Sequence, residues 1–267
     1  MLRVILSGGL GNQLFQYATG YALARREGLP LCLDTATGFR ADRVYRRSYE
    51  LGAFPQLAFD ARVERPSRRA WLWLRLRHRW RNPAICRMLG VVDEKLHGGG
   101  GAIRIQTQHP KPLLIGFWQE EAYFADFREP IRAALRLPVE QAPERAFALH
   151  VRRVQYSRAV GDEYFEAAVA RARERCPGAE FHLFTDDPEW GRRYCEERPD
   201  CRLRSEAGSS AMEDFRRMLG FRNFIIANST FSWWAAWLGE REASLVIAPR
   251  REKWANPLSP PERWTLI

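Results

Sequence analysis

A polar triplet near the carboxyl end of the chain has the residue types of an anion site. Asn228, Ser229 and Thr230 follow the apolar residues 225–227 and precede a tryptophan-rich stretch that stops at Gly239. Asn, Ser and Thr are N-cap residues, and glycine after an apolar stretch ends helices, so we expect a buried strand that leads directly into a helix. The first turn of such a helix has free N–H groups and partial positive charge, which suit phosphate. A well-capped core helix is the alternative.

Two adjacent arginines end another apolar run of strand length. Arg152 and Arg153 follow His150 in the segment that begins at residue 146. An unpaired guanidinium is costly to desolvate, so arginines at the end of a buried strand need partners. A guanidinium at this position suits bidentate contact with a diphosphate. Salt bridges between two lobes are the alternative.

A glycine-rich turn follows the first apolar segment of the chain. It contains Gly9 and Gly11, but Leu14 stands where a dinucleotide-binding fingerprint requires a third glycine, and no phosphate-loop lysine follows. The pattern therefore predicts only a tight strand-to-helix turn at which backbone can approach a ligand. Asn12 adds a polar amide there, or serves as a helix cap.

Alternating strand and helix patterns are expected to position these motifs. In the second half, strands are expected at 146–152, 180–185, 224–227 and 244–248, with helices between them. The first half begins in the same way, with strands at 4–6, 31–34 and 113–117, whereas residues 40–110 have little pattern. Such units imply a mainly parallel sheet with ligands at the carboxyl ends of its strands. We predict an α/β protein with two Rossmann-like lobes, residues 1–143 and 144–267.

Composition excludes several classes of protein. The chain has 267 residues, of which 46% are hydrophobic and 12% aromatic, as in globular proteins rather than disordered ones. We expect neither a signal peptide nor a membrane-spanning segment. The five scattered cysteines lack a Cys-x-x-Cys pair, which favours reduced thiols and a cytoplasmic protein without zinc. The chain also lacks Asp-x-Asp, and the pair Asp186-Asp187 is explained by a helix cap, so we expect no metal site.

The net charge of +10 is concentrated in residues 62–87, which contain nine arginines and a single acid, Glu64. As a helix, the segment 70–80 would place the side chains of Leu72, Trp73, Leu76 and Trp80 on one side and most arginines on the other. A basic helix with an apolar stripe suits the plane of a lipid interface. The alternatives are an ordinary helix with a solvated basic face, and a non-catalytic protein that binds an anionic polymer, although RNA-binding motifs are absent.

Three segments together resemble the bacterial α-1,2-fucosyltransferases, the GDP-fucose-dependent family 11 glycosyltransferases. They are residues 8–17 (GGLGNQLFQY), 150–153 (HVRR) and 228–234 (NSTFSWW), with supporting stretches at 116–124, 184–187 and 212–214. The likeness runs from residue 2 to residue 250, and residues 55–110 contribute nothing to it. The glycine motif and the tryptophan motif are specific in this order and separation.

The resemblance implies a GT-B fold, with an N-terminal acceptor lobe, a C-terminal GDP-sugar lobe and the active site in the cleft between them. It implies inverting, metal-independent transfer of fucose from GDP-fucose to a glycan hydroxyl, as in galactoside α-1,2-fucosylation for surface polysaccharides. The donor substrate replaces any cofactor. The acceptor would be a glycan or a lipid-linked oligosaccharide at the inner face of the membrane, which residues 62–87 could contact; no nucleic acid is expected as a partner.

The likeness also implies roles for individual residues. Arg152 would stabilise the departing GDP and Asn12 would face the sugar and the acceptor, so these are the expected catalytic residues. The expected donor-binding residues are His150, Arg153, Asn228, Ser229, Thr230, Phe231, Asp186, Gly9 and Gly11. One departure concerns the family pattern His-x-Arg-Arg-x-Asp, which commonly has glycine before the aspartate, because Val154 and Gln155 occupy these positions. A neutral glutamine cannot form a charge-assisted pair, so another GDP-sugar is the alternative donor.

Overall fold

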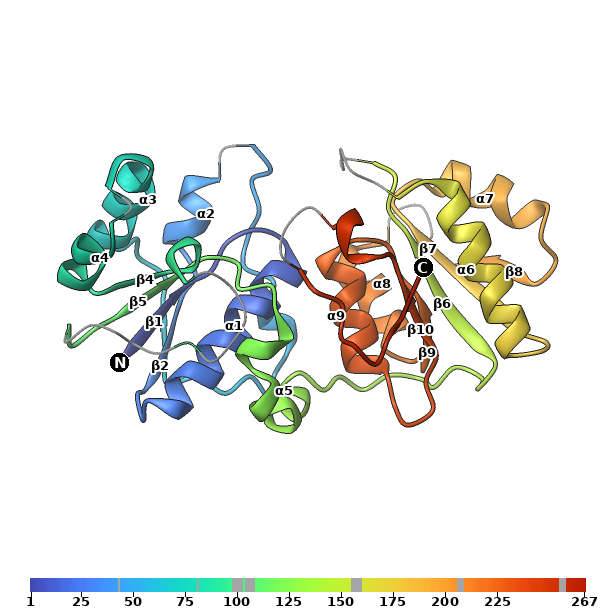
Figure 1. Ribbon diagram of the computed structural model, residues 1–267, viewed down its shortest axis with the longest axis horizontal. Coiled ribbons are helices and arrows are strands. Elements are labelled where there is room, and N and C mark those ends of the chain that lie inside the picture. The colour runs from blue at the N-terminus through green and yellow to red at the C-terminus, as the bar shows by residue number, and fades with distance from the viewer. Residues whose placement is uncertain are drawn as a thin grey trace. The chain divides into compact units, whose positions relative to one another are not determined.

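The computed structural model describes residues 1–42, 44–80, 82–97, 103, 109–154, 160–205, 209–254 and 258–267. They form two compact units, Met1–Arg136 and Leu137–Ile267 (Figure 1). The division lies a few residues before the predicted boundary between residues 143 and 144. No described helix is both long and apolar enough to cross a bilayer.

Unit 1, Met1–Arg136, contains a five-stranded parallel sheet among its described residues, in the order β3-β2-β1-β5-β4. Its strands are β1 (Leu2–Ile5), β2 (Leu31–Asp34), β3 (Ala61–Val63), β4 (Val91–Asp93) and β5 (Leu113–Ile115). Its helices are α1 (Leu10–Arg26), α2 (Thr37–Ala41), α3 (Arg68–Trp80), α4 (Pro83–Leu89) and α5 (Arg128–Ala134). β3 and β4 lie in the region where the sequence showed little pattern.

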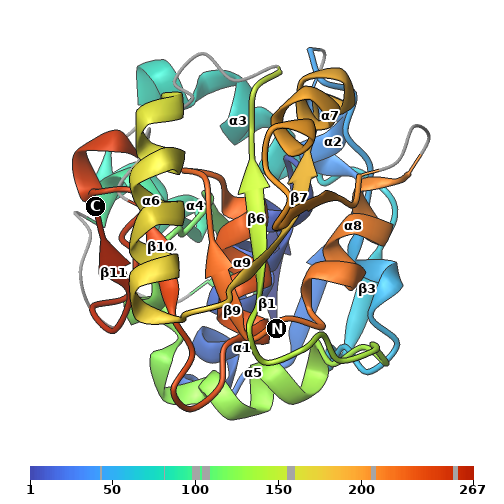
Figure 2. The ribbon, with the colours of Figure 1, turned by 90° about the vertical axis from the view of Figure 1, so that its right-hand side faces the viewer.

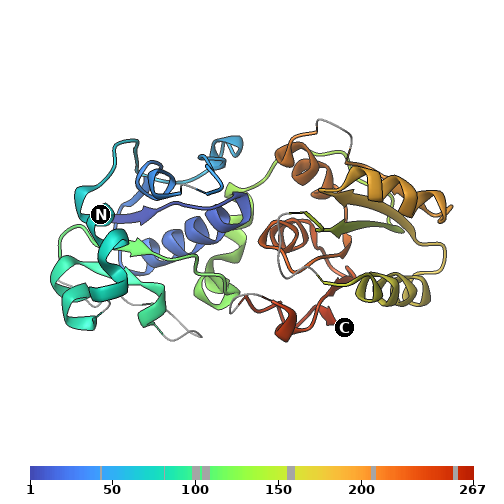
Figure 3. The same ribbon diagram turned by 90° about the horizontal axis from the view of Figure 1, so that it is seen from above.

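Helices pack on both faces of this sheet because neighbouring residues of β1 point to opposite sides. On one face, α1 (blue in Figure 3) lies so close that a Cβ added to Gly20 would be 2.3 Å from Cγ2 of Val4. On the other face, Ile5 packs in one apolar cluster with Ala70 and Trp73 of α3. The strands β1, β2, β4 and β5 are therefore largely buried on both sides, whereas β3, at the edge of the sheet, is partly exposed.

Unit 2, Leu137–Ile267, contains a six-stranded parallel sheet among its described residues, in the order β11-β10-β9-β6-β7-β8. Its strands are β6 (Ala146–Val151), β7 (Glu180–Thr185), β8 (Cys201–Leu203), β9 (Asn223–Ile225), β10 (Val246–Ala248) and β11 (Thr265–Leu266). Its helices are α6 (Asp162–Arg175), α7 (Pro188–Glu196), α8 (Ala211–Met218) and α9 (Thr230–Gly239). Figure 2 shows β6 between β7 and β9.

The expected strand and helix around residue 228 are confirmed. β9 ends at Ile225, and α9 runs from Thr230 to Gly239 with Ser229 as its N-cap. The side chains of Trp233, Trp234 and Trp237 are fully buried, and the rings of Trp233 and Trp237 stack with their centroids 6.2 Å apart. This packing fixes the axis of α9 and hence the position of its first turn.

The buried face of α3 differs from the one expected. Trp73 is buried, and its indole N–H donates to a carboxylate oxygen of Asp93 at 2.9 Å. Leu72, expected on the same side, is 44% exposed, and Trp71 is 37% exposed. The prediction is wrong for Leu72 because the hydrogen bond to Asp93, at the end of β4, turns Trp73 toward the sheet and leaves Leu72 exposed. The side chains of residues 76–80 lie outside the described part.

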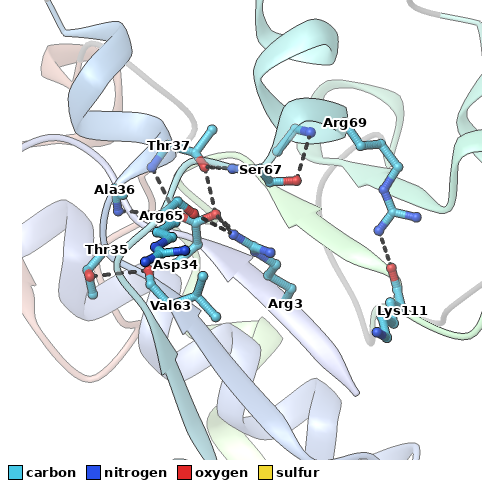
Figure 4. A network of polar contacts seen from close by, with 11 residues as sticks. Arg3, Asp34, Thr35, Ala36, Thr37, Val63, Arg65, Ser67, Arg69 and Lys111 are labelled. Carbon is cyan, nitrogen blue, oxygen red and sulfur yellow. Dashed lines mark hydrogen bonds and ion pairs between the residues drawn. The ribbon is translucent and has the colours of Figure 1, made fainter.

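One buried carboxylate holds the carboxyl edge of the sheet of unit 1 (Figure 4). Asp34 ends β2, and its oxygens accept hydrogen bonds from Arg3 on β1 at 2.6 and 2.9 Å. They also accept from the backbone N–H of Thr37 at 2.8 Å and from its hydroxyl at 2.7 Å. The hydroxyl of Thr37 in turn accepts from the backbone N–H of Ser67 at 2.8 Å, just before α3. Asp34 therefore connects both central strands, α2 and the approach to α3.

We predict that Asp34→Ala lowers the free energy of unfolding by about 3 kcal/mol, because it leaves the Arg3 guanidinium and two buried donors without their acceptor. The matched control is Glu64→Ala, which removes another carboxylate paired with an arginine, Arg62, at an exposed position. The control should cost less than about 1 kcal/mol. Urea unfolding of both variants measures the difference, and equal losses would contradict the structural importance of Asp34.

Candidate active site

Arg152 and Asp186 meet where two neighbouring strands end. The register pairs Val151 of β6 with Thr185 of β7, so the residues that follow them lie side by side. Arg152 Nε is 3.0 Å from Oδ2 of Asp186, and about a quarter of each side chain is exposed. Partial burial strengthens this pair relative to one on the open surface. A guanidinium is thereby held at the carboxyl edge of the sheet, the usual location of ligands in such folds.

Asp186 also holds the backbone of the loop that follows β6. Its Oδ1 accepts from the backbone N–H of Arg153 at 2.8 Å, and the N–H of Val154 lies 3.2 Å from each carboxylate oxygen. The side chain of Asp186, expected to bind a donor, is thus engaged with the loop after β6. Gln155, the other residue that departs from the family pattern, lies outside the described residues.

The side chain of Arg153 has different partners from that of Arg152, as the alternation of a strand predicts. Its Nη1 donates to Asp162 at 2.6 Å, and its Nε lies 3.9 Å from a carboxylate oxygen of Asp187. The guanidinium also lies over the ring of Trp190, 4.5 Å from the centroid. These contacts pair its charge and join the starts of α6 and α7.

His150 is a buried, neutral imidazole beside the first turn of α9. Burial, with a smaller contribution from Arg152, lowers the pKa of His150 to about 3, so the ring carries no charge at neutral pH. Its centroid is 5.3 Å from that of Phe231. Within the part of the chain that the structure describes, Nδ1 has no hydrogen-bond partner. Since buried polar atoms are normally satisfied, this nitrogen has unused capacity toward a ligand or water.

The three polar residues at the start of α9 have different structural roles. Ser229 is the N-cap, and its hydroxyl accepts from the N–H of Phe231 at 3.3 Å. Asn228 is buried and donates to the backbone oxygen of Lys253 at 2.7 Å, which ties the approach to α9 to the segment after β10. Thr230 begins the helix and is partly exposed. The first turn of α9 thus retains the positive end of a ten-residue helix.

The glycines in and after the turn that follows β1 have different structural roles. Gly8 has a φ of +75°, and a Cβ there would lie 2.6 Å from Nδ2 of Asn12, so the turn itself requires glycine. Gly9 has an ordinary φ of −78°, and a Cβ there would meet only the guanidinium carbon of Arg47, at 4.0 Å. Gly11 is buried in the first turn of α1. The described fold therefore needs Gly8 for its backbone, whereas Gly9 leaves room at the N-terminus of α1.

Asn12 lies in the first turn of α1 and is not its cap, because the N-cap is Gly9. The alternative that Asn12 caps the helix is therefore wrong. Its Oδ1 accepts from Nε2 of Gln119 at 2.7 Å. One helical turn later, Gln16 donates to the backbone oxygen of Gly116 at 2.9 Å. Sequence reasoning noted the segment 116–124 but assigned no role to Gln119, because a contact between residues so distant in sequence leaves no local pattern.

The expected site residues thus form two groups, one in each unit. Those of unit 2 lie at the carboxyl ends of its strands and the start of α9: His150, Arg152, Arg153, Asp186, Asn228, Ser229, Thr230 and Phe231. Those of unit 1 lie in the turn after β1 and the first turn of α1: Gly9, Gly11 and Asn12. Among the described residues, no group of three or more His, Cys, Asp or Glu side chains could hold a metal ion.

Comparisons with known proteins show the family of the chain. Residues 108–256 match the sequence profile of Glycosyl transferase family 11. An α-1,2-colitosyltransferase of Escherichia coli is 27% identical, covering 98% of this chain and 97% of its own. The galactoside 2-α-L-fucosyltransferase Sec1 of Mus musculus is 27% identical, covering 89% of this chain and 64% of its own.

A crystal structure of NodZ α-1,6-fucosyltransferase soaked with GDP-fucose has a similar fold, with a TM-score of 0.52 and 15% identity over 96% of each chain. Its two-unit α/β architecture is that of the GT-B glycosyltransferases, which confirms the expected fold class. The family profile covers more than half of the sequence. The chain therefore belongs to glycosyltransferase family 11.

Proposed function

We propose that this glycosyltransferase moves fucose from GDP-fucose to the 2-hydroxyl of a galactoside within a glycan acceptor, with inversion and without a metal or cofactor. The observation that carries the proposal is the guanidinium of Arg152, held by Asp186 at the carboxyl edge of unit 2. The acceptor position is supported by the resemblance of the sequence motifs and by two relatives whose names both specify transfer to position 2.

In the proposed reaction, unit 2 binds the GDP moiety. The acceptor hydroxyl forms a bond to the anomeric carbon and releases its proton to solvent, while the bond from that carbon to the diphosphate breaks, so negative charge increases on the departing GDP. Arg152 and the first turn of α9 provide fixed positive charge for this group. His150, being neutral, can accept or donate a hydrogen bond but is too weak a base to take a proton at neutral pH.

Unit 1 provides the acceptor side in this proposal. Because Oδ1 of Asn12 accepts from Gln119, the amide is oriented with Nδ2 available as a donor, and an amide N–H suits a sugar hydroxyl or ring oxygen. The free space next to Gly9 lies at the same end of α1. Asn12 would thus orient the sugars rather than exchange protons with them.

A colitosyl group is the second candidate for the transferred sugar. It is favoured by the similarity to the α-1,2-colitosyltransferase over nearly the whole chain. Parallel assays with GDP-fucose and GDP-colitose, compared by kcat/KM, decide between the two donors. Family membership sets aside the alternative of a non-catalytic binder of anionic polymers.

We also propose that α3 attaches the enzyme to anionic membranes, where a lipid-linked acceptor would be located. One face of α3 carries four exposed side chains at the spacing i, i+3, i+4 and i+7. They are Arg68, Trp71, Leu72 and Arg75. The guanidinium of Arg75 lies over the ring of Trp71, 4.7 Å from the centroid. Basic and aromatic side chains on one exposed face suit the headgroup region of a bilayer.

We predict that Arg152→Ala lowers kcat about 10²- to 10³-fold, because the variant lacks a fixed charge at the leaving group. Arg152→Lys should recover part of the loss, since lysine keeps the charge but not the planar fork. The matched control is Arg173→Ala, which removes another arginine that is paired with an aspartate, Asp200, in unit 2. A folded Arg152→Ala enzyme with more than about a third of the wild-type rate would exclude Arg152 from the reaction.

Activity should persist in excess EDTA, because Arg152 and the first turn of α9 offer the positive charge that a metal supplies in other transferases. The assay measures transfer from GDP-fucose before and after dialysis against the chelator. Loss of activity that Mn²⁺ or Mg²⁺ restores would show that the reaction depends on a metal.

The enzyme should sediment with anionic liposomes at low salt and be released at high salt, since each basic residue near an anionic surface contributes about 1 kcal/mol and salt screens this attraction. Replacing Arg68 and Arg75 by glutamine should weaken binding, and so should Trp71→Ala. The control replaces Arg145 and Arg175, exposed arginines of unit 2, by glutamine. Equal sedimentation with neutral and anionic liposomes would refute the attachment.

A further inference from the structure

The turn that follows β5 contains two residues in the left-handed region of backbone space. Gly116 has a φ of +148° and Trp118 has a φ of +56°. This conformation is unfavourable for a bulky residue such as tryptophan, so the surrounding structure must enforce it. Strain of this kind is concentrated at positions where a protein fixes a side chain for a purpose.

The carboxylate of Glu94 enforces the conformation. One of its oxygens accepts from the backbone N–H of Phe117 and the other from that of Trp118, both at 2.7 Å. The indole of Trp118 is fully buried and packs edge-on against Tyr123, with the ring centroids 5.4 Å apart. The turn is thus fixed by a charged acceptor and by an aromatic anchor.

Two contacts with α1 place the turn beside Asn12. Asn12 and Gln16 lie one helical turn apart and therefore on one face of α1. Gln16 donates to the oxygen of Gly116 at 2.9 Å, and Gln119 donates to Asn12 at 2.7 Å. Phe117 lies between these two anchor points in sequence. Its side chain is 36% exposed, whereas that of Trp118 is buried completely.

We propose that Phe117 is a stacking platform for a pyranose ring of the acceptor glycan. A pyranose has C–H groups on its faces and hydroxyls at its edge, so it needs an apolar surface with polar groups beside it. Phe117 offers the aromatic surface. The polar group is the amide of Asn12 on α1, which is held by Gln119, two residues after Phe117. The rigid backbone lowers the entropic cost of binding. This inference rests on the proposed function of unit 1.

The test compares Phe117→Ala with the wild type in steady-state kinetics. The donor is GDP-fucose, and the acceptor is whichever of lactose, N-acetyllactosamine and lacto-N-biose the wild type uses best. The KM for the acceptor should rise about tenfold, the effect of one aromatic contact, while kcat and the KM for GDP-fucose stay within about twofold. Phe117→Trp should retain a low KM, because an aromatic face remains. Slow hydrolysis of GDP-fucose without acceptor should not change.

The matched control is Phe59→Ala, since Phe59 is another phenylalanine of unit 1 with the same 36% exposure. An unchanged acceptor KM in Phe117→Ala would overturn the platform. The proposed function would still stand in that case, because the wild type transfers fucose to the acceptor. A parallel loss of acceptor-free hydrolysis would also overturn it, because the side chain would then act through the fold. Absence of transfer by the wild type to all three galactosides, with GDP-fucose hydrolysis retained, would refute the proposed function, and the platform with it.

Discussion

The arrangement of the candidate site in unit 2 depends on the contacts that the carboxylate of Asp186 makes. It binds a guanidinium and two backbone N–H groups at once, so the position of Arg152 and the path of its loop are set by the same group. An arginine on an unrestrained loop would lose its side-chain freedom only on binding a ligand, whereas here that entropy is lost during folding. Folding free energy is thereby used to place charge in advance.

Unit 1 uses the same device at a position without expected chemistry. Asp34 ends β2 and holds Arg3 of the neighbouring β1, just as Asp186 follows β7 and holds the arginine that follows β6. In both units a carboxylate at the end of one parallel strand, or directly after it, fixes an arginine in the adjacent strand or directly after that strand. Parallel sheets bring these ends together at one edge, and opposite charges there satisfy groups that would otherwise be expensive to bury.

Much of the fold and part of the site could be predicted from local patterns. The N-cap Ser229 and the final Gly239 defined the bounds of α9, because both residues lie at the ends of the helix itself and can be read from the local sequence. The contacts of Gln119 with Asn12 and of Glu94 with the turn after β5 could not be predicted, since they join residues far apart in sequence. The exposure of Leu72 on α3 was missed for the same reason, because the contact of its neighbour Trp73 with Asp93 joins distant parts of the sequence.

The open position at Gly9 has a consequence for how this enzyme can diverge. Its φ of −78° is ordinary for any L-amino acid, and a Cβ there would meet a single atom, at 4.0 Å. A mutation to alanine or serine therefore costs the described fold little, yet its side chain fills free space at the amino end of α1, close to Asn12. Under the function proposed for unit 1, a single codon would thus alter which sugars fit while leaving stability nearly constant, so selection on substrate range at this position would be decoupled from selection on folding.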